Sequence, residues 1–144
     1  MKKQNYQNHR RFVPVFHFVL SAFILTITIL AFVHLYRVWM AHESRLIAGM
    51  FILISLSMLI GFVCMRDFPI KAQDRAIRAE ENLRHFSLTG KLLDKNLKIG
   101  QIIALRFAPD EEFVGLAERA VTQNLGVNDI KKAIKNWKED HHRA

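Results

Sequence analysis

Two long apolar runs fill most of the N-terminal half of the chain, and a mixed polar region follows them. The first run, VPVFHFVLSAFILTITILAFVHLY, covers residues 13–36 and holds two histidines but no Asp, Glu, Lys or Arg. The second run, 46–65, holds no charged residue. At about 1.5 Å per residue each run makes a helix of roughly 30–35 Å, enough to cross a hydrocarbon core of about 30 Å. Both runs are therefore predicted to be transmembrane helices, since only internal hydrogen bonds satisfy the backbone in lipid.

The short connection between the runs predicts their arrangement. Residues 37–45 leave room only for a turn, so the two spans are expected to form an antiparallel hairpin. A cleaved signal peptide is the rival interpretation, but its apolar core would be about 7–15 residues long and followed by a small-x-small cleavage site. The first run is longer, and the sequence RVWMAHE after it offers no such site.

The distribution of Lys and Arg predicts the orientation. The turn 37–45 holds two basic residues, whereas both outer flanks are richer in them. Basic residues favour the cytoplasmic side, so both termini are expected there, in the inner (cytoplasmic) cell membrane. Residues 1–12 then form a basic cytoplasmic tail, 37–45 an external turn and 66–144 a cytoplasmic helical region. The flanking basic residues are Lys2, Lys3, Arg10 and Arg11 before the first span and Arg66, Lys71, Arg75 and Arg78 after the second.

Few polar side chains lie within the spans. His17 and His34 are about 25 Å apart along one helix, so they cannot share a metal or a proton. A neutral His near each end of a span can reach the interface, and a weak role in pH sensing or partner contact stays open. Two pairs with small-xxx-small spacing let helix backbones approach closely, either within the hairpin or against a second copy. They are Ala22 with Thr26 and Ser57 with Gly61.

A juxtamembrane helix is predicted from Lys71 to Leu88, because this stretch is dense in helix formers. Pro69 is expected to break the chain or to open the first turn, and Gly90 to end the helix. Acid–base pairs at i,i+4 recur as Asp74–Arg78, Glu80–Arg84 and Glu81–His85. A set of apolar residues spaced 4, 3, 4 and 3 favours either a helix packed on its own tail or a short coiled coil. This set is Ala72, Ala76, Ala79, Leu83 and Phe86.

Three short amphipathic helices are predicted after Gly90, each with one apolar face. The acids of PDEEF suit a first turn, where they complement the helix dipole, and residues 124–126 suit a stop. Asn128 or Asp129 can cap the last helix. Helices this short need a shared core, so the chain as a whole is predicted to be all-α. The three apolar faces are Ile99, Ile102, Ile103 and Phe107; Phe113, Leu116, Ala117, Ala120 and Val121; and Ile130, Ala133, Ile134 and Trp137.

The net charge of +8 does not indicate a nucleic-acid footprint. Residues 66–144 hold 15 Lys and Arg against 12 Asp and Glu, so the excess lies at the N-terminus, where it acts as a topology signal. Four lysines are predicted to lie opposite the apolar face of the last helix, where they could meet an acidic protein partner or an anionic membrane surface. They are Lys131, Lys132, Lys135 and Lys138, and Trp137 is expected to pack into the tail.

The sequence offers no recognisable catalytic chemistry. The single cysteine, Cys64, excludes an intrachain disulfide, and no nucleophile elbow, glycine-rich phosphate loop or metal-spaced His/Cys set is present. We therefore predict no catalytic, cofactor-binding or metal-binding residue, no small-molecule substrate and no enzymatic activity.

The segments QDRAIRAEENLRHF, QIIALRFAPDEEF and IKKAIKNW, behind two spans, resemble an uncharacterised family of small bacterial two-span membrane proteins. The resemblance covers nearly the whole chain and implies no activity or site residue. We expect a non-catalytic integral membrane protein whose helical region serves protein–protein interaction or oligomer assembly. A membrane-tethered nucleic-acid-binding module, favoured only by a helix-turn-helix rhythm around Phe107–Asp110, and an accessory subunit of a transport complex are the alternatives.

Overall fold

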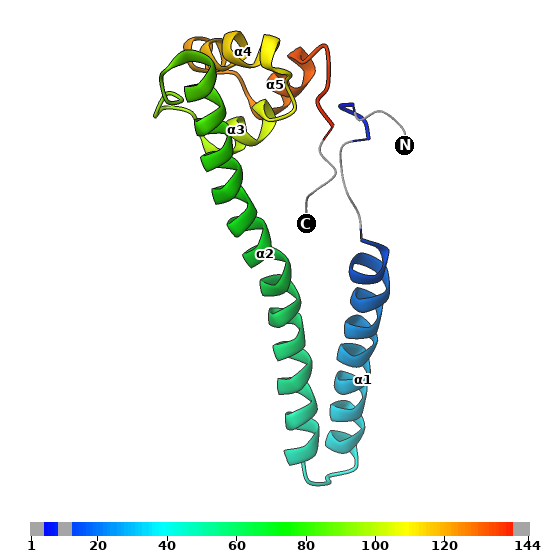
Figure 1. Cartoon of the computed structure of the whole chain (residues 1–144). Coiled ribbons are helices and arrows are strands. Elements are labelled where there is room, and N and C mark those ends of the chain that lie inside the picture. The colour runs from blue at the N-terminus through cyan, green and yellow to red at the C-terminus, as the bar shows by residue number, and fades with distance from the viewer. Residues whose placement is uncertain (1–4, 9–12, 140–144) are drawn as a thin grey trace. The chain divides into compact units, whose positions relative to one another are not determined.

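The structure, a computed structural model, describes residues 5–8 and 13–139. Within these ranges all regular elements are helical, which confirms the predicted all-α class. They are a π-helical segment η1 (Val15–Leu20), α1 (Ser21–Met40), α2 (Leu46–Thr89), α3 (Ile99–Leu105), α4 (Asp110–Thr122) and α5 (Val127–Ala133), as Figure 1 shows. The basic residues expected in the N-terminal tail, Lys2, Lys3, Arg10 and Arg11, lie outside the described residues.

The chain divides into two compact units, and α2 contributes to both. The apolar unit comprises residues 11–68, and the helical unit comprises 1–10 and 69–144. Two helical stretches, Val15–Met40 and α2, are long and apolar enough to cross a membrane. The first stretch continues to Met40, beyond the predicted end at Tyr36. The residues from 37 to 40 include no helix breaker, and Ala41 is the C-terminal cap.

Within the apolar unit, the buried side chains of the helices recur every seven residues. Ile24, Ala31 and Val38 are the buried residues of α1, and Ala48 and Ser55 are buried on α2. Most other side chains of these stretches are exposed, as expected of helices whose remaining faces contact lipid. Two ring pairs join the same stretches. The rings of Phe16 and Phe62 stack with centroids 4.5 Å apart, and the ring of His34 meets that of Phe51 edge-on at 5.7 Å.

The prediction of a break or a new first turn at Pro69 is wrong. Residue 69 lies inside α2, so the expected juxtamembrane helix is a continuation of the second apolar helix. Proline's φ suits an α-helix, and its main costs are one lost backbone hydrogen bond and crowding against the preceding turn. Strong helix formers on its C-terminal side offset that cost. The predicted stop is confirmed, because Gly90 adopts a positive φ of 74° and its N–H donates to the Phe86 carbonyl at 2.8 Å.

The helical unit has its own apolar core, which confirms that the short helices share one. The core is built by α3, α4 and α5 together with the loop after α2. Phe107 and Phe113 are its largest buried side chains. Its other buried members are Leu93, Leu97, Ile102, Ala104, Leu105, Ala108, Leu116, Ala117, Ala120, Ile130 and Ile134. The predicted face of α3 is partly wrong, since Ile99 is 37 % exposed while Ala104 and Leu105 are buried.

Polar side chains fix the starts of α3 and α5. At the start of α3, the Gln101 side chain accepts the Lys98 N–H at 2.7 Å and donates to the Leu125 carbonyl at 2.9 Å. At α5, the Asp129 carboxylate accepts the Gly126 N–H at 3.2 Å. One residue of each of α3 and α5 therefore caps its own helix from the first turn.

The last predicted helix is too long at its C-terminal end. The α5 helix ends at Ala133, and Ile134 has an extended backbone. Trp137 still reaches the core, as predicted, but from the non-helical segment 134–139. Its ring lies 5.0 Å from that of Phe107, and the Lys138 N–H donates to the Phe107 carbonyl at 2.8 Å. Contacts to α4, described below, replace the hydrogen bonds of the missing helical turn.

Candidate interaction surface

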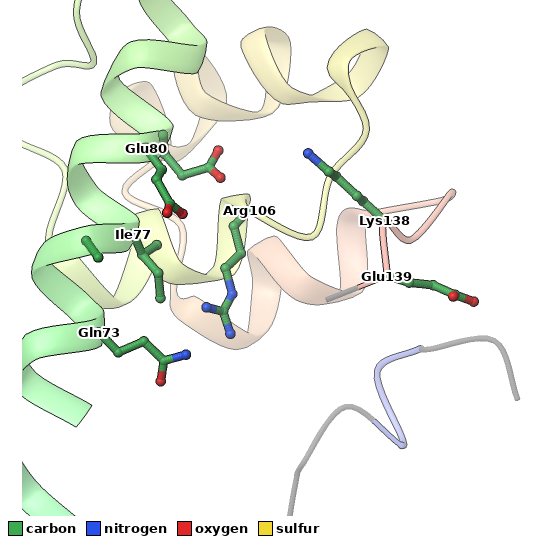
Figure 2. Close-up of a pocket in the computed structure, with 8 residues that line it drawn as sticks. Gln73, Ile77, Glu80, Arg106, Lys138 and Glu139 are labelled. Atoms are coloured by element: carbon green, nitrogen blue, oxygen red, sulfur yellow. The ribbon is translucent and has the colours of Figure 1, made fainter. Parts of the chain in front are cut away.

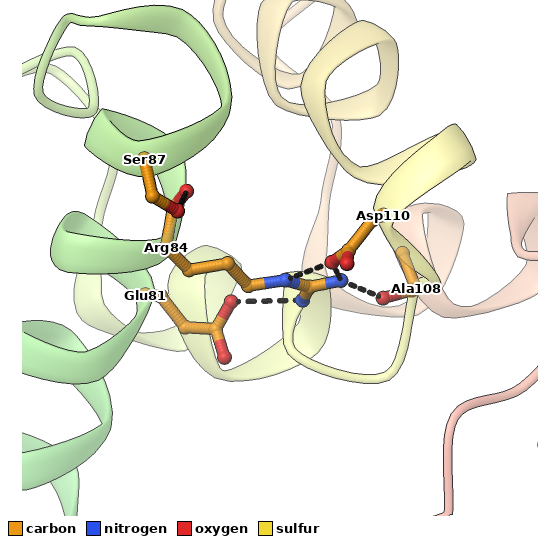
Figure 3. A network of polar contacts seen from close by, with 5 residues as sticks. All are labelled: Glu81, Arg84, Ser87, Ala108 and Asp110. Carbon is orange, nitrogen blue, oxygen red and sulfur yellow. Dashed lines mark hydrogen bonds and ion pairs between the residues drawn. The ribbon is translucent and has the colours of Figure 1, made fainter.

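Arg84 fixes one face of α2 onto α4. Its guanidinium bonds the Asp110 carboxylate at 2.6 and 2.7 Å, the Glu81 carboxylate at 3.1 Å and the Ala108 carbonyl at 2.8 Å, as Figure 3 shows. It also lies 4.3 Å from the centroid of the Phe113 ring. The side chains of Arg84 and Glu81 are only 12 % and 9 % exposed. Arg84 therefore neutralises a buried carboxylate and joins two helices.

Further contacts tie the end of α2 to the loop after it. His85 Nδ1 lies 2.7 Å from the Lys91 carbonyl, and the Leu93 N–H donates to the Asn82 side chain at 3.2 Å. The His85 ring meets the Phe113 ring edge-on at 5.9 Å. These contacts hold the C-terminal end of α2 against the core, and Ile77 and Glu81 are buried earlier on the same helix.

Glu112 holds the segment after α5. Its carboxylate accepts the backbone N–H groups of Lys135 and Asn136 at 2.9 and 3.0 Å and the Asn136 side-chain amide at 3.1 Å. The hydrogen bond from Lys135 is the main cause that lowers the pKa of Glu112, and partial burial opposes it. The carboxylate thus compensates the backbone donors left where α5 ends early.

A pocket of about 280 Å³ lies between α2, the end of α3 and the C-terminal segment. Figure 2 shows Gln73, Ile77 and Glu80 reaching it from α2, with Arg106, Lys138 and Glu139 on other sides. Its charges are of both signs and oppose one another, so it has no single preference for an anion or a cation. Among the residues that the structure describes, no group of three His, Cys, Asp or Glu could hold a metal ion.

Another face of α2 carries an exposed apolar stripe, which we call the α2 stripe and whose member Ala76 also lies at the edge of the pocket. The spacing of this set favoured either packing on its own tail or a short coiled coil. All five members are exposed and only Ala76 lies beside the tail, so the first prediction is wrong for the set as a whole. The physical reason is that Arg84, His85 and Ile77 turn the other face of the helix toward the core. Leu83 is 69 % and Phe86 52 % exposed. The α2 stripe consists of Ala72, Ala76, Ala79, Leu83 and Phe86.

The predicted small-xxx-small pairs contribute little to contacts within the chain. Ala22, Thr26 and Ser57 are exposed and Gly61 is half-buried. The hydroxyls of Thr26 and Ser57 donate to carbonyls of their own helices, those of Ala22 and Leu53, at 2.9 and 2.8 Å. Their packing on a second copy stays a prediction.

Three of the four predicted lysines, Lys131, Lys132 and Lys135, line one open pocket beside Tyr6 and Trp137, whereas Lys138 lines the pocket next to α2. The Lys131 amine lies 5.9 Å from the centroid of the Phe107 ring, and the Lys132 amine 5.8 Å from that of Tyr6. Lys135 and Lys138 are exposed and follow the end of α5, so the predicted helical face does not unite them. Contact of these lysines with a partner or a membrane surface stays a prediction.

Sequence reasoning missed the roles of Arg84 and Glu112. A local i,i+4 pattern paired Arg84 with Glu80, whereas its partners in the structure are Glu81 and Asp110. The three first-turn acids were interpreted as complements of the helix dipole. Two of them, Asp110 and Glu112, instead bond groups 26 and 23 residues away in the chain. An acid-rich first turn next to a proline is the only sequence signal, and it names no partner.

These features define an all-α protein with two helices long and apolar enough to cross a membrane and a helical unit with its own core. The chain belongs to the Family of unknown function (DUF6526), whose family model matches residues 1–144. The expected membership of an uncharacterised family is thus confirmed. No curated protein and no solved structure matches the chain.

Proposed function

We propose that this protein is a non-catalytic integral membrane protein that assembles with other protein subunits through the α2 stripe. Its two apolar helices cross the cell membrane as an antiparallel hairpin with both termini in the cytoplasm, and its helical unit lies in the cytoplasm. The uncovered α2 stripe is the observation that carries this proposal.

The hairpin is supported by contacts at both ends of the apolar helices. Phe16, near the start of the first helix, stacks on Phe62 near the end of the second apolar run, and His34 meets Phe51 at the other end. The seven-residue repeat of buried side chains is the spacing of two helices that pack side by side. The contact of Lys132 with Tyr6 supports termini that share one side of the membrane.

Cysteine labelling tests the topology. In a Cys64→Ser background, a membrane-impermeant maleimide added to intact cells should label Ser44→Cys and leave Lys95→Cys unlabelled. Both variants should react after the membrane is permeabilised. Labelling of Lys95→Cys in intact cells would refute the cytoplasmic location of the helical unit.

Assembly is supported because the α2 stripe lies beyond the charged residues that end the second apolar run. Arg66, Asp67 and Lys71 follow that run, so Leu83 and Phe86 are surrounded by water rather than by lipid acyl chains. Single exposed apolar residues are ordinary, but an exposed series at regular helical spacing is typical of an interaction site. Contact with another subunit would remove this stripe from water.

A protein partner fits the helical unit better than a nucleic acid does. The middle helix, α4, carries four acids and one basic residue, Arg119, so it would repel phosphate groups. An accessory role in a transport complex remains one form of subunit assembly.

Site-specific photocrosslinking in membranes tests the assembly. A photoreactive amino acid at Leu83 should give a discrete protein adduct, whereas the same probe at Glu118, exposed on α4, should not. The adduct should disappear when Phe86→Asp is added, because a charge in the stripe opposes its burial. Equal yields at the two positions, or an adduct unaffected by Phe86→Asp, would show that the α2 stripe is not an assembly site.

A further inference from the structure

We propose that the partner of the α2 stripe is a second copy of this chain, aligned in parallel and in register, with Arg75 of each copy paired with Glu80 of the other. This inference rests on the proposed function, because it names the occupant of the same face.

The spacing of the α2 stripe is that of a two-stranded coiled coil. In a heptad labelled a to g, Ala76 and Leu83 occupy a positions, and Ala72, Ala79 and Phe86 occupy d positions. The stripe therefore follows one continuous seam for about two heptads, with small residues toward the apolar unit and large ones toward Gly90. A second copy presents an identical seam, and identical seams can align in register.

The helical unit leaves this seam free for a second helix. The α2 side chains that it buries most are those of Ile77, Glu81 and Arg84, at b and f positions away from the seam. Ala76 and Glu80 line the neighbouring pocket but stay exposed. Because all five residues of the stripe are exposed, a second copy can approach without displacing the core or the Arg84 network. This is why a helix–helix contact, rather than a rearrangement of the tail, fits the structure.

The charges beside the seam select a parallel second copy. Arg75 lies at a g position and Glu80 at the following e position, and both are exposed. In a parallel coiled coil, a g residue faces the e residue of the next heptad on the partner, which is five positions further along. Arg75 of one copy then meets Glu80 of the other twice per dimer. In an antiparallel pair, g faces g and e faces e, so like charges would meet.

Membrane insertion imposes the same direction. Copies inserted with the same topology carry their α2 helices in the same direction, so they can meet in parallel without a change of fold. The next g and e residues, Asn82 and Ser87, are uncharged. The Arg75–Glu80 pair is therefore the charge contact that sets the register, and reversing it gives a clean test.

Disulfide crosslinking of the full chain in membranes tests the seam. In a Cys64→Ser background, Ala79→Cys and Leu83→Cys should each form a covalent dimer under mild oxidation, because equal a or d positions face each other in an in-register pair. Arg78→Cys, exposed at a c position, is the matched control and should stay monomeric. Equal dimer yields at Arg78 and Ala79 would overturn the proposed seam.

Charge reversal tests the direction and the register. Energy transfer between donor- and acceptor-labelled copies in lipid vesicles gives the association constant. Arg75→Glu or Glu80→Arg alone should weaken association about five- to tenfold, because two exposed ion pairs become repulsive. The double variant should return to within about twofold of the original, and Arg78→Glu should have no effect.

The outcomes separate this inference from the proposed function. If Leu83 gives only a self-adduct but charge reversal has no effect, assembly stands and the parallel Arg75–Glu80 pairing is wrong. If the adduct contains only a different protein and no covalent dimer forms, assembly stands and the second copy is wrong. If no adduct forms, the proposed function itself fails.

Discussion

Removing the Arg84 guanidinium should be among the most damaging single changes in the helical unit. Arg84→Met keeps most of the aliphatic stem but leaves the Glu81 carboxylate, 9 % exposed, without its cation. Breaking one partner of a buried ion pair costs about 3–5 kcal/mol. A unit of this size carries roughly 4–11 kcal/mol of stability in total. We therefore expect Arg84→Met to remove at least about a quarter of the free energy of unfolding.

Trp137 provides the assay. The chain has two tryptophans, so a Trp39→Phe background makes the emission report only on the helical unit, where Trp137 packs on Phe107. Urea titration of the full chain in lipid nanodiscs then gives the unfolding midpoint of that unit. In the Trp39→Phe background without further change, the Trp137 emission should be blue-shifted in the absence of anionic lipid.

Two matched variants make the result decisive. Arg78→Met removes an exposed guanidinium from the same helix and should change stability by no more than about 0.5 kcal/mol. Adding Glu81→Leu to Arg84→Met removes the orphaned charge and should restore at least half of the loss. The Glu81 carboxylate does not depend on Arg84 if Arg84→Met behaves like Arg78→Met, or if the double variant is less stable than Arg84→Met alone.

Three other outcomes are expected. Because the folded pKa of Glu112 is lowered, its contribution is complete above its unfolded value of about 4.3 and fades as the pH falls through the lower folded value. Glu112→Gln should therefore be less stable than the original protein at pH 7 but equal to it in strong acid, and a gap that persists in acid would contradict this account. Leu116→Asp should cost about 3–5 kcal/mol in the Trp137 assay, whereas Thr122→Asp, exposed on the same helix, should cost little; similar costs would mean that Leu116 is not in the core. Pro69→Ala should slow amide hydrogen exchange in the surrounding turn by supplying the missing donor, and unchanged exchange there would argue against a continuous α2.

The sequence predicted those features that depend on local periodicity. The two apolar runs and the faces around Phe113 and Ile130 follow from the repeat of apolar residues, and the left-handed Gly90 follows from its lack of a side chain. The continuation of the helix through Pro69 could not be predicted from the local sequence. The tendency of proline to end a helix is a local property, whereas the helix continues because a long apolar helix precedes this residue. The sequence also could not predict the buried face of α2, because that face is determined by partners of Arg84 that lie far away in the chain.

The role of Trp137 shows the same limit in another form. Its apolar character predicted contact with the core, and the structure confirms the contact. The helix expected to deliver it ends at Ala133, because hydrogen bonds to Glu112 substitute for those of another helical turn. The spacing of the apolar residues therefore predicted correctly that Trp137 contacts the core, but wrongly that it does so from a helix.

The Glu112 contact also determines which substitutions this segment can tolerate. Its carboxylate accepts backbone N–H groups, which every residue except proline provides. The side chain at position 135 is exposed, and its charge is the smallest of the causes that lower the pKa of Glu112. A library of substitutions at position 135 should therefore tolerate nearly any amino acid and exclude proline, while position 112 should tolerate almost no change. Sequence variation in this segment would then be wide, although its path along the protein stays fixed.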